Sequence, residues 1–189
     1  GATLLSIQDG THLPEIFLYD DEGHAGKLPL TKHSIRLAGT GWHVEDTYDD
    51  DKEEWNYTRE GYDTVDGIYA HKIRKSLKDP RLRAASPYAE RVIYLDNNNL
   101  YFVRSDYVDR DGRLIKVLRA SLHEDMGADD PPRVRARRLV IEDLENDALF
   151  VMVLQKANYE FSLPEDLFTP DSVAAWDEDT DRWLAEQLK

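Results

Sequence analysis

The stretch that decides the fold reads Tyr88-Ala89-Glu90-Arg91-Val92-Ile93-Tyr94-Leu95-Asp96, and two more strand-like segments follow it at 100–108 and 114–122. The first apolar run, 90–95, is separated from the second by Asp96-Asn97-Asn98-Asn99, and the second from the third by Asp109-Arg110-Asp111-Gly112. Asp, Asn and Gly readily adopt the backbone conformations that tight hairpins need. We therefore predict three consecutive antiparallel strands here.

The same rhythm of short apolar segments and turn residues continues on both sides. The further strands that it predicts span residues 4–7, 15–19, 34–38, 55–58, 68–73, 134–142, 149–156 and 159–163. Near the end the pattern changes: a helical turn is expected at 165–168, a short helix at 172–176 with Asp171 as N-cap, and a helix at 179–188. The sequence thus predicts a mainly β protein with few helices, in which about nine or ten strands form a single, mostly antiparallel sheet.

Two strongly charged stretches interrupt the strand pattern. Residues 45–54 are too acidic for a core segment, so a loop or one helical turn on the surface is expected there. Residues 72–87 are basic and contain Pro80 and Pro87, which predicts a loop that interrupts the sheet. We expect both stretches to lie outside the regular strands.

The balance of charge limits the choice of partner. Of 189 residues, 38 are acidic and 24 are basic, which gives a net charge of −14 at pH 7. Duplex DNA and anionic membranes would repel such a chain, so no nucleic-acid partner is expected. Hydrophobic residues make up 41% of the sequence, enough for a core. No apolar run approaches the ~18 residues of a transmembrane helix, so no membrane-spanning segment is expected.

No motif for catalysis, metal binding or cofactor binding stands out. The chain has no cysteine, and its six histidines lack the i, i+2 or i, i+4 spacing of a metal pair. The segment Gly23-His24-Ala25-Gly26-Lys27 is too short for a phosphate-binding loop, and no serine has the G-x-S-x-G context of a hydrolase. An enzyme that uses paired carboxylates remains a third reading, without a motif of its own. We expect no catalytic residue, no metal and no cofactor.

Arginine gathers on one predicted strand. Arg133, Arg135 and Arg137 alternate with small apolar residues, which places three guanidinium groups on one strand face. Nucleic-acid binding is opposed by the overall charge, which leaves a solvated face paired with carboxylates or a docking patch for an acidic protein or lipid headgroup. The docking reading defines the alternative function, a module that docks an envelope transporter or assembly factor.

Several predicted strands are apolar on both faces. Val92 and Tyr94 point to one side of their strand, whereas Ile93 and Leu95 point to the other. An antiparallel sheet normally leaves one face to water, so something must cover both faces here. Helices, a partner or a ligand could provide that cover.

From Val65 onward, five pieces of the chain resemble outer-membrane lipoprotein-sorting proteins and occur in the same order. Val65-Asp66-Gly67 with 69–74, and then 88–96, are similar to the central strands of that family. Residues 107–116 (Tyr-Val-Asp-Arg-Asp-Gly-Arg-Leu-Ile-Lys) match its "y-D-x-dG-k-l-k" hairpin. Residues 140–143 and 159–169 match its last strands and its "lp-d-lFt" ending.

The resemblance implies the fold of the periplasmic lipoprotein carrier LolA and its outer-membrane acceptor LolB. That fold is a curved antiparallel sheet that forms an incomplete, half-open barrel around an apolar cavity, with a few short helices as a lid. The resemblance further implies a non-catalytic periplasmic protein that binds acyl chains of a lipid or lipoprotein. It also implies partners in the envelope, among them an inner-membrane lipid exporter.

The resemblance also bears on particular parts of the chain. Residues 1–189 are expected to form one LolA-like domain without the family's N-terminal helix and first strands, and with no signal peptide in the sequence. In the carrier an arginine on an early strand tethers a lid, and Arg36 is its loose counterpart. Candidates to line the cavity are large side chains in or beside the strands: Phe17, Trp42, Tyr57, Tyr69, Tyr94, Phe102 and Met152.

Overall fold

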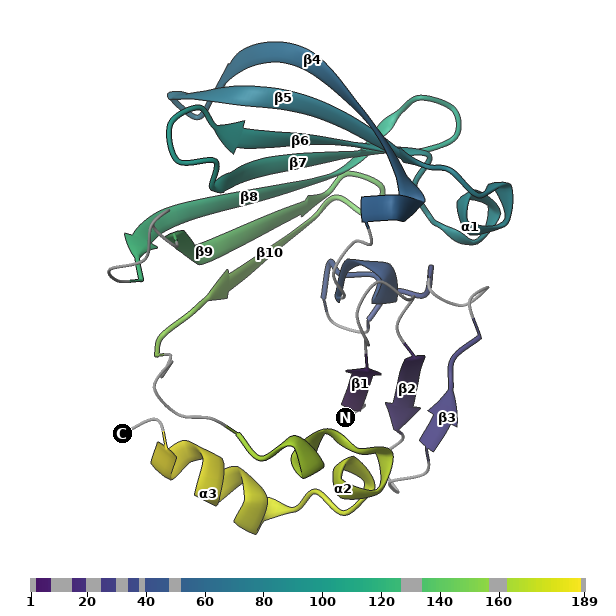
Figure 1. The fold of residues 1–189 in the computed structure, drawn as a ribbon, viewed down its shortest axis with the longest axis vertical. Coiled ribbons are helices and arrows are strands. Elements are labelled where there is room, and N and C mark those ends of the chain that lie inside the picture. The colour runs from purple at the N-terminus through teal and green to yellow at the C-terminus, as the bar shows by residue number, and fades with distance from the viewer. Residues whose placement is uncertain are drawn as a thin grey trace.

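A seven-stranded antiparallel sheet dominates the computed structural model, which describes residues 3–7, 15–19, 25–29, 34–37, 40–47, 52–126, 134–156 and 163–187. Its strands neighbour one another in chain order (Figure 1). They are β4 (Trp55–Val65), β5 (Ile68–Leu77), β6 (Glu90–Asp96), β7 (Phe102–Val108), β8 (Leu114–Asp125), β9 (Val134–Asp143) and β10 (Ala148–Val153). The edge strands β4 and β10 do not pair with each other, so the barrel is incomplete.

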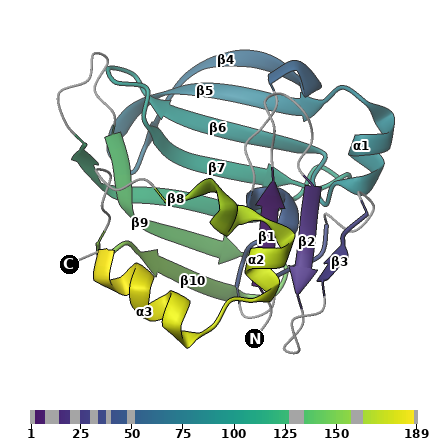
Figure 2. The ribbon, with the colours of Figure 1, turned by 60° about the horizontal axis from the view of Figure 1, so that its bottom comes forward.

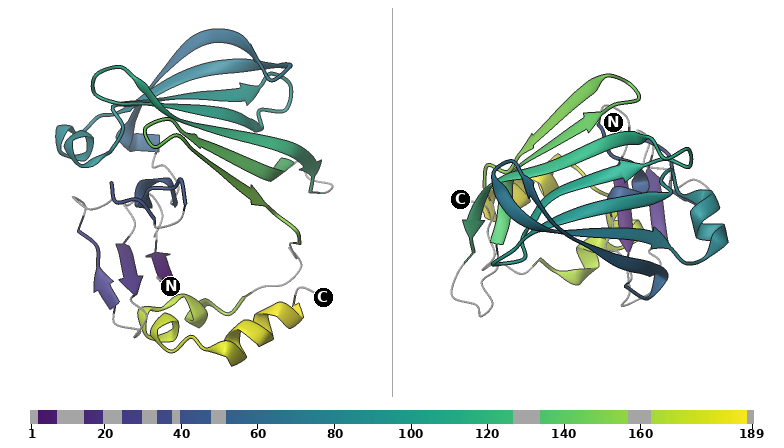
Figure 3. Two further views of the ribbon diagram at one scale, coloured as in Figure 1. Left: turned by 180° about the vertical axis from the view of Figure 1, so that it is seen from behind. Right: turned by 90° about the horizontal axis from the view of Figure 1, so that it is seen from above.

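Smaller elements lie to one side of this sheet. A three-stranded antiparallel sheet consists of β1 (Thr3–Ile7), β2 (Glu15–Tyr19) and β3 (Ala25–Lys27). The helices are η2 (Val44–Thr47), η3 (Lys52–Glu54), α1 (Pro80–Ala85), η4 (Glu165–Phe168), α2 (Pro170–Ala174) and α3 (Glu178–Gln187). The small sheet and the helices after β10 lie on the same side of the large sheet (Figures 2 and 3). Tyr19 of β2 donates a hydrogen bond to the carbonyl of Pro170, at 3.0 Å, and so joins the two.

The large sheet therefore has an inner face, turned toward these smaller elements, and an outer face. Successive side chains of a strand alternate between the faces, and residues opposite each other in register share a face. On the inner face Arg91, Tyr107 and Lys116 oppose one another across β6, β7 and β8. Tyr94 of β6 points to the outer face, three residues along the strand from Arg91.

Turn chemistry explains the hairpins. Between β4 and β5, Asp66 and Gly67 have φ of 51° and 82°, the positive values that a two-residue hairpin turn requires. Between β7 and β8, Gly112 has φ of 78°, and the Asp109 carboxylate accepts the backbone N–H of Arg113 at 2.9 Å. The predicted central hairpins are confirmed.

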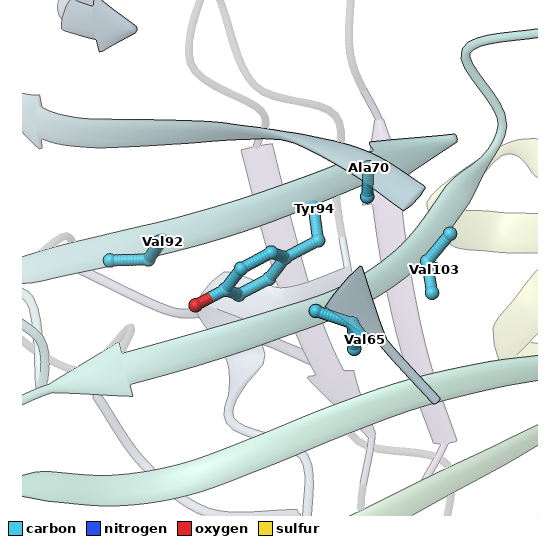
Figure 4. Close-up of a cluster of buried hydrophobic side chains, with 5 residues drawn as sticks. All are labelled: Val65, Ala70, Val92, Tyr94 and Val103. Atoms are coloured by element: carbon cyan, nitrogen blue, oxygen red, sulfur yellow. The ribbon is translucent and has the colours of Figure 1, made fainter. Parts of the chain in front are cut away.

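Both faces of the large sheet carry a hydrophobic cluster. The outer cluster consists of Val65, Ala70, Val92, Tyr94 and Val103, from β4 to β7 (Figure 4). The inner cluster consists of Tyr88, Tyr107, Ile115, Leu118 and Ile141, with Trp42, Phe102, Leu139 and Phe150 packed against it. Both faces thus carry buried apolar side chains, as the two-sided apolar strands predicted.

The mainly β, half-open fold is confirmed, but the strands form two sheets where a single sheet was predicted. The loop predicted at 72–87 is wrong, because β5 continues to Leu77 and α1 follows, with the Asp79 side chain accepting the N–H of Arg81 at 2.7 Å as its N-cap. The basic residues fit the strand because they are paired: Arg74 forms ion pairs with Glu60 and Glu90.

Several boundaries also differ from the prediction. In place of a strand at 34–38, Arg36 makes one isolated bridge with His43. The N-cap of α2 is Thr169, two residues before the predicted Asp171, because Pro170 occupies the first helical position. Strand β3 was not predicted, and α3 begins one residue before the predicted helix. Most of the strand predicted at 159–163 falls outside the described residues.

Candidate functional site

Residues 40–47, here called the strap, cross the inner face of the large sheet. Gly41 lies so close to β9 and β10 that a Cβ atom would stand 2.6 Å from Ile141 Cγ2 and 2.7 Å from Phe150 Cδ2. Real side chains do not approach so closely, so only glycine fits at this position. The contact holds Trp42 of the strap against the end of the sheet.

A pocket of about 440 Å³ lies between the strap and the edge of the sheet. Its lining is almost entirely apolar and consists of Thr40, Trp42, Leu139, Ile141, Leu149, Phe150, Val151 and Met152. The volume falls within the range of roughly 300–1,000 Å³ that is usual for small-ligand sites. Since none of the described residues in the lining is charged, the pocket suits an apolar ligand.

Beyond Trp42 the strap carries a carboxylate into the interior. The Asp46 side chain is almost completely buried, and it receives hydrogen bonds from the Lys116 ammonium group and, at 2.9 Å, from the Tyr88 hydroxyl. Its Oδ2 also accepts the backbone N–H of His43 at 2.8 Å, which closes the turn of η2. Asp46 thus joins the strap to the strand β8.

Glu45, the neighbour of Asp46, makes a second buried attachment. It forms an ion pair with the Arg91 guanidinium of β6 and accepts a hydrogen bond from the Ser86 hydroxyl at 2.9 Å. We call Glu45 and Asp46 together the acidic clip. Because two charged partners would both be left buried without it, the clip holds the strap firmly on the sheet.

The clip changes the titration of the groups around it. Burial alone would raise the pKa of Asp46, but the hydrogen bond with His43 and the positive charges of Lys116 and Arg91 hold that pKa well below its usual range. Burial lowers the pKa of Lys116 to about 8, against the attraction of Asp46. Burial and the Arg91 charge lower the pKa of Lys75 to about 6.

A second set of ion pairs holds the chain before the strap. Arg36 forms an ion pair with Asp143 at the end of β9 and another with Glu145 of the following turn, at 2.9 Å. Asp143 also accepts the backbone N–H groups of Glu145 and Asn146, each at 3.2 Å. The arginine that the resemblance compared with a lid tether therefore joins the entry of the strap to the β9–β10 hairpin.

The structure brings some of the predicted lining residues together. Trp42 and Met152 both line the pocket, and Phe102 packs against the inner cluster that continues from it. Tyr57 and Tyr69 belong to the far strands β4 and β5 and are about half exposed, at 47% and 54%.

Two predicted lining residues lie apart from the pocket. Tyr94 is buried in the outer cluster, whereas Trp42 packs against the inner cluster on the other face of the sheet. Phe17 lies in β2 of the small sheet, opposite Leu5 and Lys27.

The predicted docking arginines are engaged within the chain. Arg133 lies outside the described residues. Arg135 forms an ion pair with Glu124 on β8, and Arg137 donates to the carbonyls of Leu154 and Gln155 at 3.4 and 3.3 Å. The two described arginines thus support the sheet edge next to the pocket.

Sequence reasoning missed the acidic clip. The segment 45–54 does form helical turns, but its expected surface position is wrong for Glu45 and Asp46, which are buried. The signal available was the position of Arg91 and Lys116, each next to an apolar run inside a predicted strand. A buried cation needs a buried anion, and these two indicated that one would arrive from elsewhere in the chain.

The arrangement of these groups suits binding. Among the described residues, no three His, Asp or Glu side chains are grouped so as to hold a metal ion. Within the same residues, no helix combines the length and the hydropathy needed to cross a membrane. What the site offers is an apolar pocket beneath a strap that is held by charge.

Known structures share this architecture. A domain from Vibrio parahaemolyticus described as an outer membrane lipoprotein-sorting protein superimposes with a TM-score of 0.79 at 16% identity, over 90% of this chain and 70% of its own. A DUF1329 family protein from Desulfovibrio piger gives 0.79 at 20% identity, over 92% and 71%. A LolA superfamily protein from Nitrosomonas europaea gives 0.56 at 14% identity, over 87% and 74%.

The fold is therefore LolA-like, as the sequence resemblance implied. A protein-family model described as "uncharacterized protein" matches residues 1–174, and the chain belongs to that family. Among curated proteins, none matches the sequence.

Proposed function

We propose that this protein binds the acyl chains of a lipid or lipoprotein in the pocket beneath Trp42 and carries them without catalysing a reaction. The observation that carries the proposal is the pocket itself, about 440 Å³ with an apolar lining. The lipoprotein-sorting and LolA names of two structural neighbours support the same ligand class.

The expected affinity follows from the burial of methylene groups. Each methylene that leaves water contributes about 0.8 kcal/mol, so ten of them give about 8 kcal/mol before the costs of association. A dissociation constant of 1 μM corresponds to about 8.2 kcal/mol. Because the costs of association reduce the gross gain of about 8 kcal/mol, a single acyl chain is expected to bind more weakly than about 1 μM and therefore reversibly, as a carrier requires.

The strap is the proposed gate. Trp42 contributes to the pocket wall, and the acidic clip fixes the following residues on β6 and β8. Movement about Gly41 would open the pocket without breaking the clip. The setting is the periplasm, with an inner-membrane lipid exporter as the class of donor.

A fluorescent fatty acid titration, with native mass spectrometry of the purified protein, tests the proposal. Met152→Asp places a carboxylate at the pocket wall and is expected to weaken binding at least tenfold, because a charge in an apolar site is costly. Val153→Asp is the matched control: it is the next residue of β10, it is similarly exposed (54% against 49%), and it does not line the pocket.

The control should bind as the unmodified protein does. Absence of saturable binding to the unmodified protein, together with a lipid-free mass, would contradict the proposal. Equal loss of binding in the two variants would place the ligand elsewhere.

A further inference from the structure

The edge strand β10 is apolar throughout. Its sequence is Ala-Leu-Phe-Val-Met-Val, with neither charge nor proline, and Leu149 and Val153 are 63% and 54% exposed. Edge strands are normally protected by lysine, proline or a covering segment, because their free N–H and C=O groups pair readily with another strand. Within the described part of the chain, no other segment donates a backbone hydrogen bond to the open side of β10.

The register shows which backbone groups are open. Leu154 donates its N–H to the carbonyl of Arg137 at 2.8 Å, which makes these two a hydrogen-bonded pair next to the end of β10. In an antiparallel ladder, hydrogen-bonded and non-hydrogen-bonded pairs alternate. Ala148, Phe150 and Met152 therefore bond to β9, whereas the N–H and C=O groups of Leu149, Val151 and Val153 point away from the sheet.

We propose that β10 pairs with β10 of a second copy of this chain, antiparallel about a two-fold axis at Val151. In this register Val151 opposes the partner's Val151, and Leu149 opposes the partner's Val153. By symmetry Val153 also opposes the partner's Leu149. All three pairs use the outward backbone groups, and each pair exchanges two hydrogen bonds. The inner faces of the two copies also match, since Phe150 then lies beside the partner's Met152.

Charge favours a second copy as the occupant. Asp147 lies in the turn before β10, near Glu145, which also pairs with Arg36, and Lys156 follows the strand. Antiparallel pairing of two identical strands places each Lys156 close to the partner's acidic turn, so the ends of the strand are complementary to themselves.

The pairing would also complete the pocket. Phe150 and Met152 line the pocket at its β10 side, together with Leu149 and Val151. The partner's Met152 would extend this wall, and the two pockets would lie side by side along one sheet. This consequence rests on the proposed function, whereas the pairing itself does not.

Cysteine cross-linking tests the register. The chain has no cysteine, so Val151→Cys introduces a single thiol. Opposed residues of a hydrogen-bonded pair have Cα atoms about 5.5 Å apart, within the roughly 4.4–6.8 Å that a disulfide spans. Val153→Cys is the matched control, because its partner copy would lie four residues away, at about 14 Å. Oxidation should yield a covalent dimer of Val151→Cys and leave Val153→Cys uncross-linked.

Sedimentation velocity of the unmodified protein and of Val151→Pro tests the association. Proline at 151 removes an outward N–H and leaves the β9–β10 bonds in place, so it should abolish a dimer, whereas Val151→Thr should retain it. Circular dichroism checks that both variants fold. A monomeric unmodified protein, or a dimer that persists in Val151→Pro, would overturn the pairing.

Other outcomes separate the two proposals. A monomer that instead captures a peptide of the β10 sequence fused to an unrelated carrier would overturn the two-fold pairing. A monomer that still binds the fatty acid overturns the pairing but supports the proposed function. A dimer that does not bind the fatty acid supports the pairing but overturns the proposed function.

Discussion

The Lys75 side chain is buried: the residue is 2% exposed, and its Nζ lies 4.0 Å from the centroid of the Trp55 ring. Burial and the charge of Arg91 lower its pKa to about 6. In the unfolded chain a lysine titrates near 10.4. Between about pH 6 and pH 10 the unfolded state therefore binds more protons, so this residue makes stability rise with pH across that window.

Replacement of Lys75 by methionine is expected to flatten that dependence. Urea unfolding at several pH values between 6 and 10 should show a smaller rise in the free energy of unfolding for Lys75→Met, with a remainder from Lys116, whose pKa is lowered to about 8. Lys72→Met is the control, because Lys72 lies on the opposite face beside Glu60 at 3.4 Å. An unchanged slope in Lys75→Met would contradict the assignment.

Addition of a single Cβ atom at Gly41 tests whether the strap packs against β9 and β10. Gly41→Ala would push a methyl group against Ile141 and Phe150, and is expected to cost about 1–3 kcal/mol of stability. Gly26→Ala meets no atom within 4 Å and should stay within about 0.5 kcal/mol. Chemical denaturation measures both. Similar stabilities of the two variants would mean that the strap does not lie on the sheet as described.

At the scale of elements, η2 is held by charge more than by its own helical structure. Asp46→Asn keeps the shape of the side chain but removes the charge that Lys116 and Arg91 face, and breaking such buried pairs typically costs about 3–5 kcal/mol. Because the pKa of Asp46 is lowered in the folded state, its contribution is present above about pH 4 and lost as the pH falls below that.

Thermal and urea unfolding at pH 7 and pH 3 check the result for η2. The difference between Asp46→Asn and the unmodified protein should be large at pH 7 and smaller at pH 3. Asp66→Asn, at an exposed turn, is the control and should change stability little. A loss of stability in Asp46→Asn that is the same at both pH values would argue against a role for the charge.

The elements that the sequence predicted best are those with local causes. The Asp109–Gly112 turn requires particular residues at adjacent positions, so the hairpin that it closes could be read directly. The end of β5 was missed because Arg74 is neutralised by Glu60 and Glu90 on neighbouring strands. Such pairing across strands depends on register, which composition does not contain.

The same limit applied to the candidate site. Tyr94 and Phe102 look alike in the sequence, yet the register of β6 and β7 shifts between them and the two rings face opposite sides of the sheet. Trp42 and Met152 meet at one pocket although 110 positions separate their numbers, a contact that only the folded sheet creates.

At the scale of the whole molecule, ligand binding should be visible as stability. A ligand at about a hundred times its dissociation constant raises the free energy of unfolding by about 2.7 kcal/mol. Saturating fatty acid should therefore raise the melting temperature of the unmodified protein and leave that of Met152→Asp nearly unchanged. Differential scanning fluorimetry gives the answer, and equal shifts in both proteins would contradict a site at β10.

The acidic clip has a consequence for the order in which the chain folds. Hairpins of the large sheet join residues that are close in sequence, whereas Asp46 reaches Lys116 across 70 positions and Arg36 reaches Asp143 across 107. Contacts between distant residues form late, because the chain must first close the loop between them. During synthesis the strap leaves the ribosome long before the strands that receive it, and the carboxylates of Glu45 and Asp46 stay hydrated until those strands form.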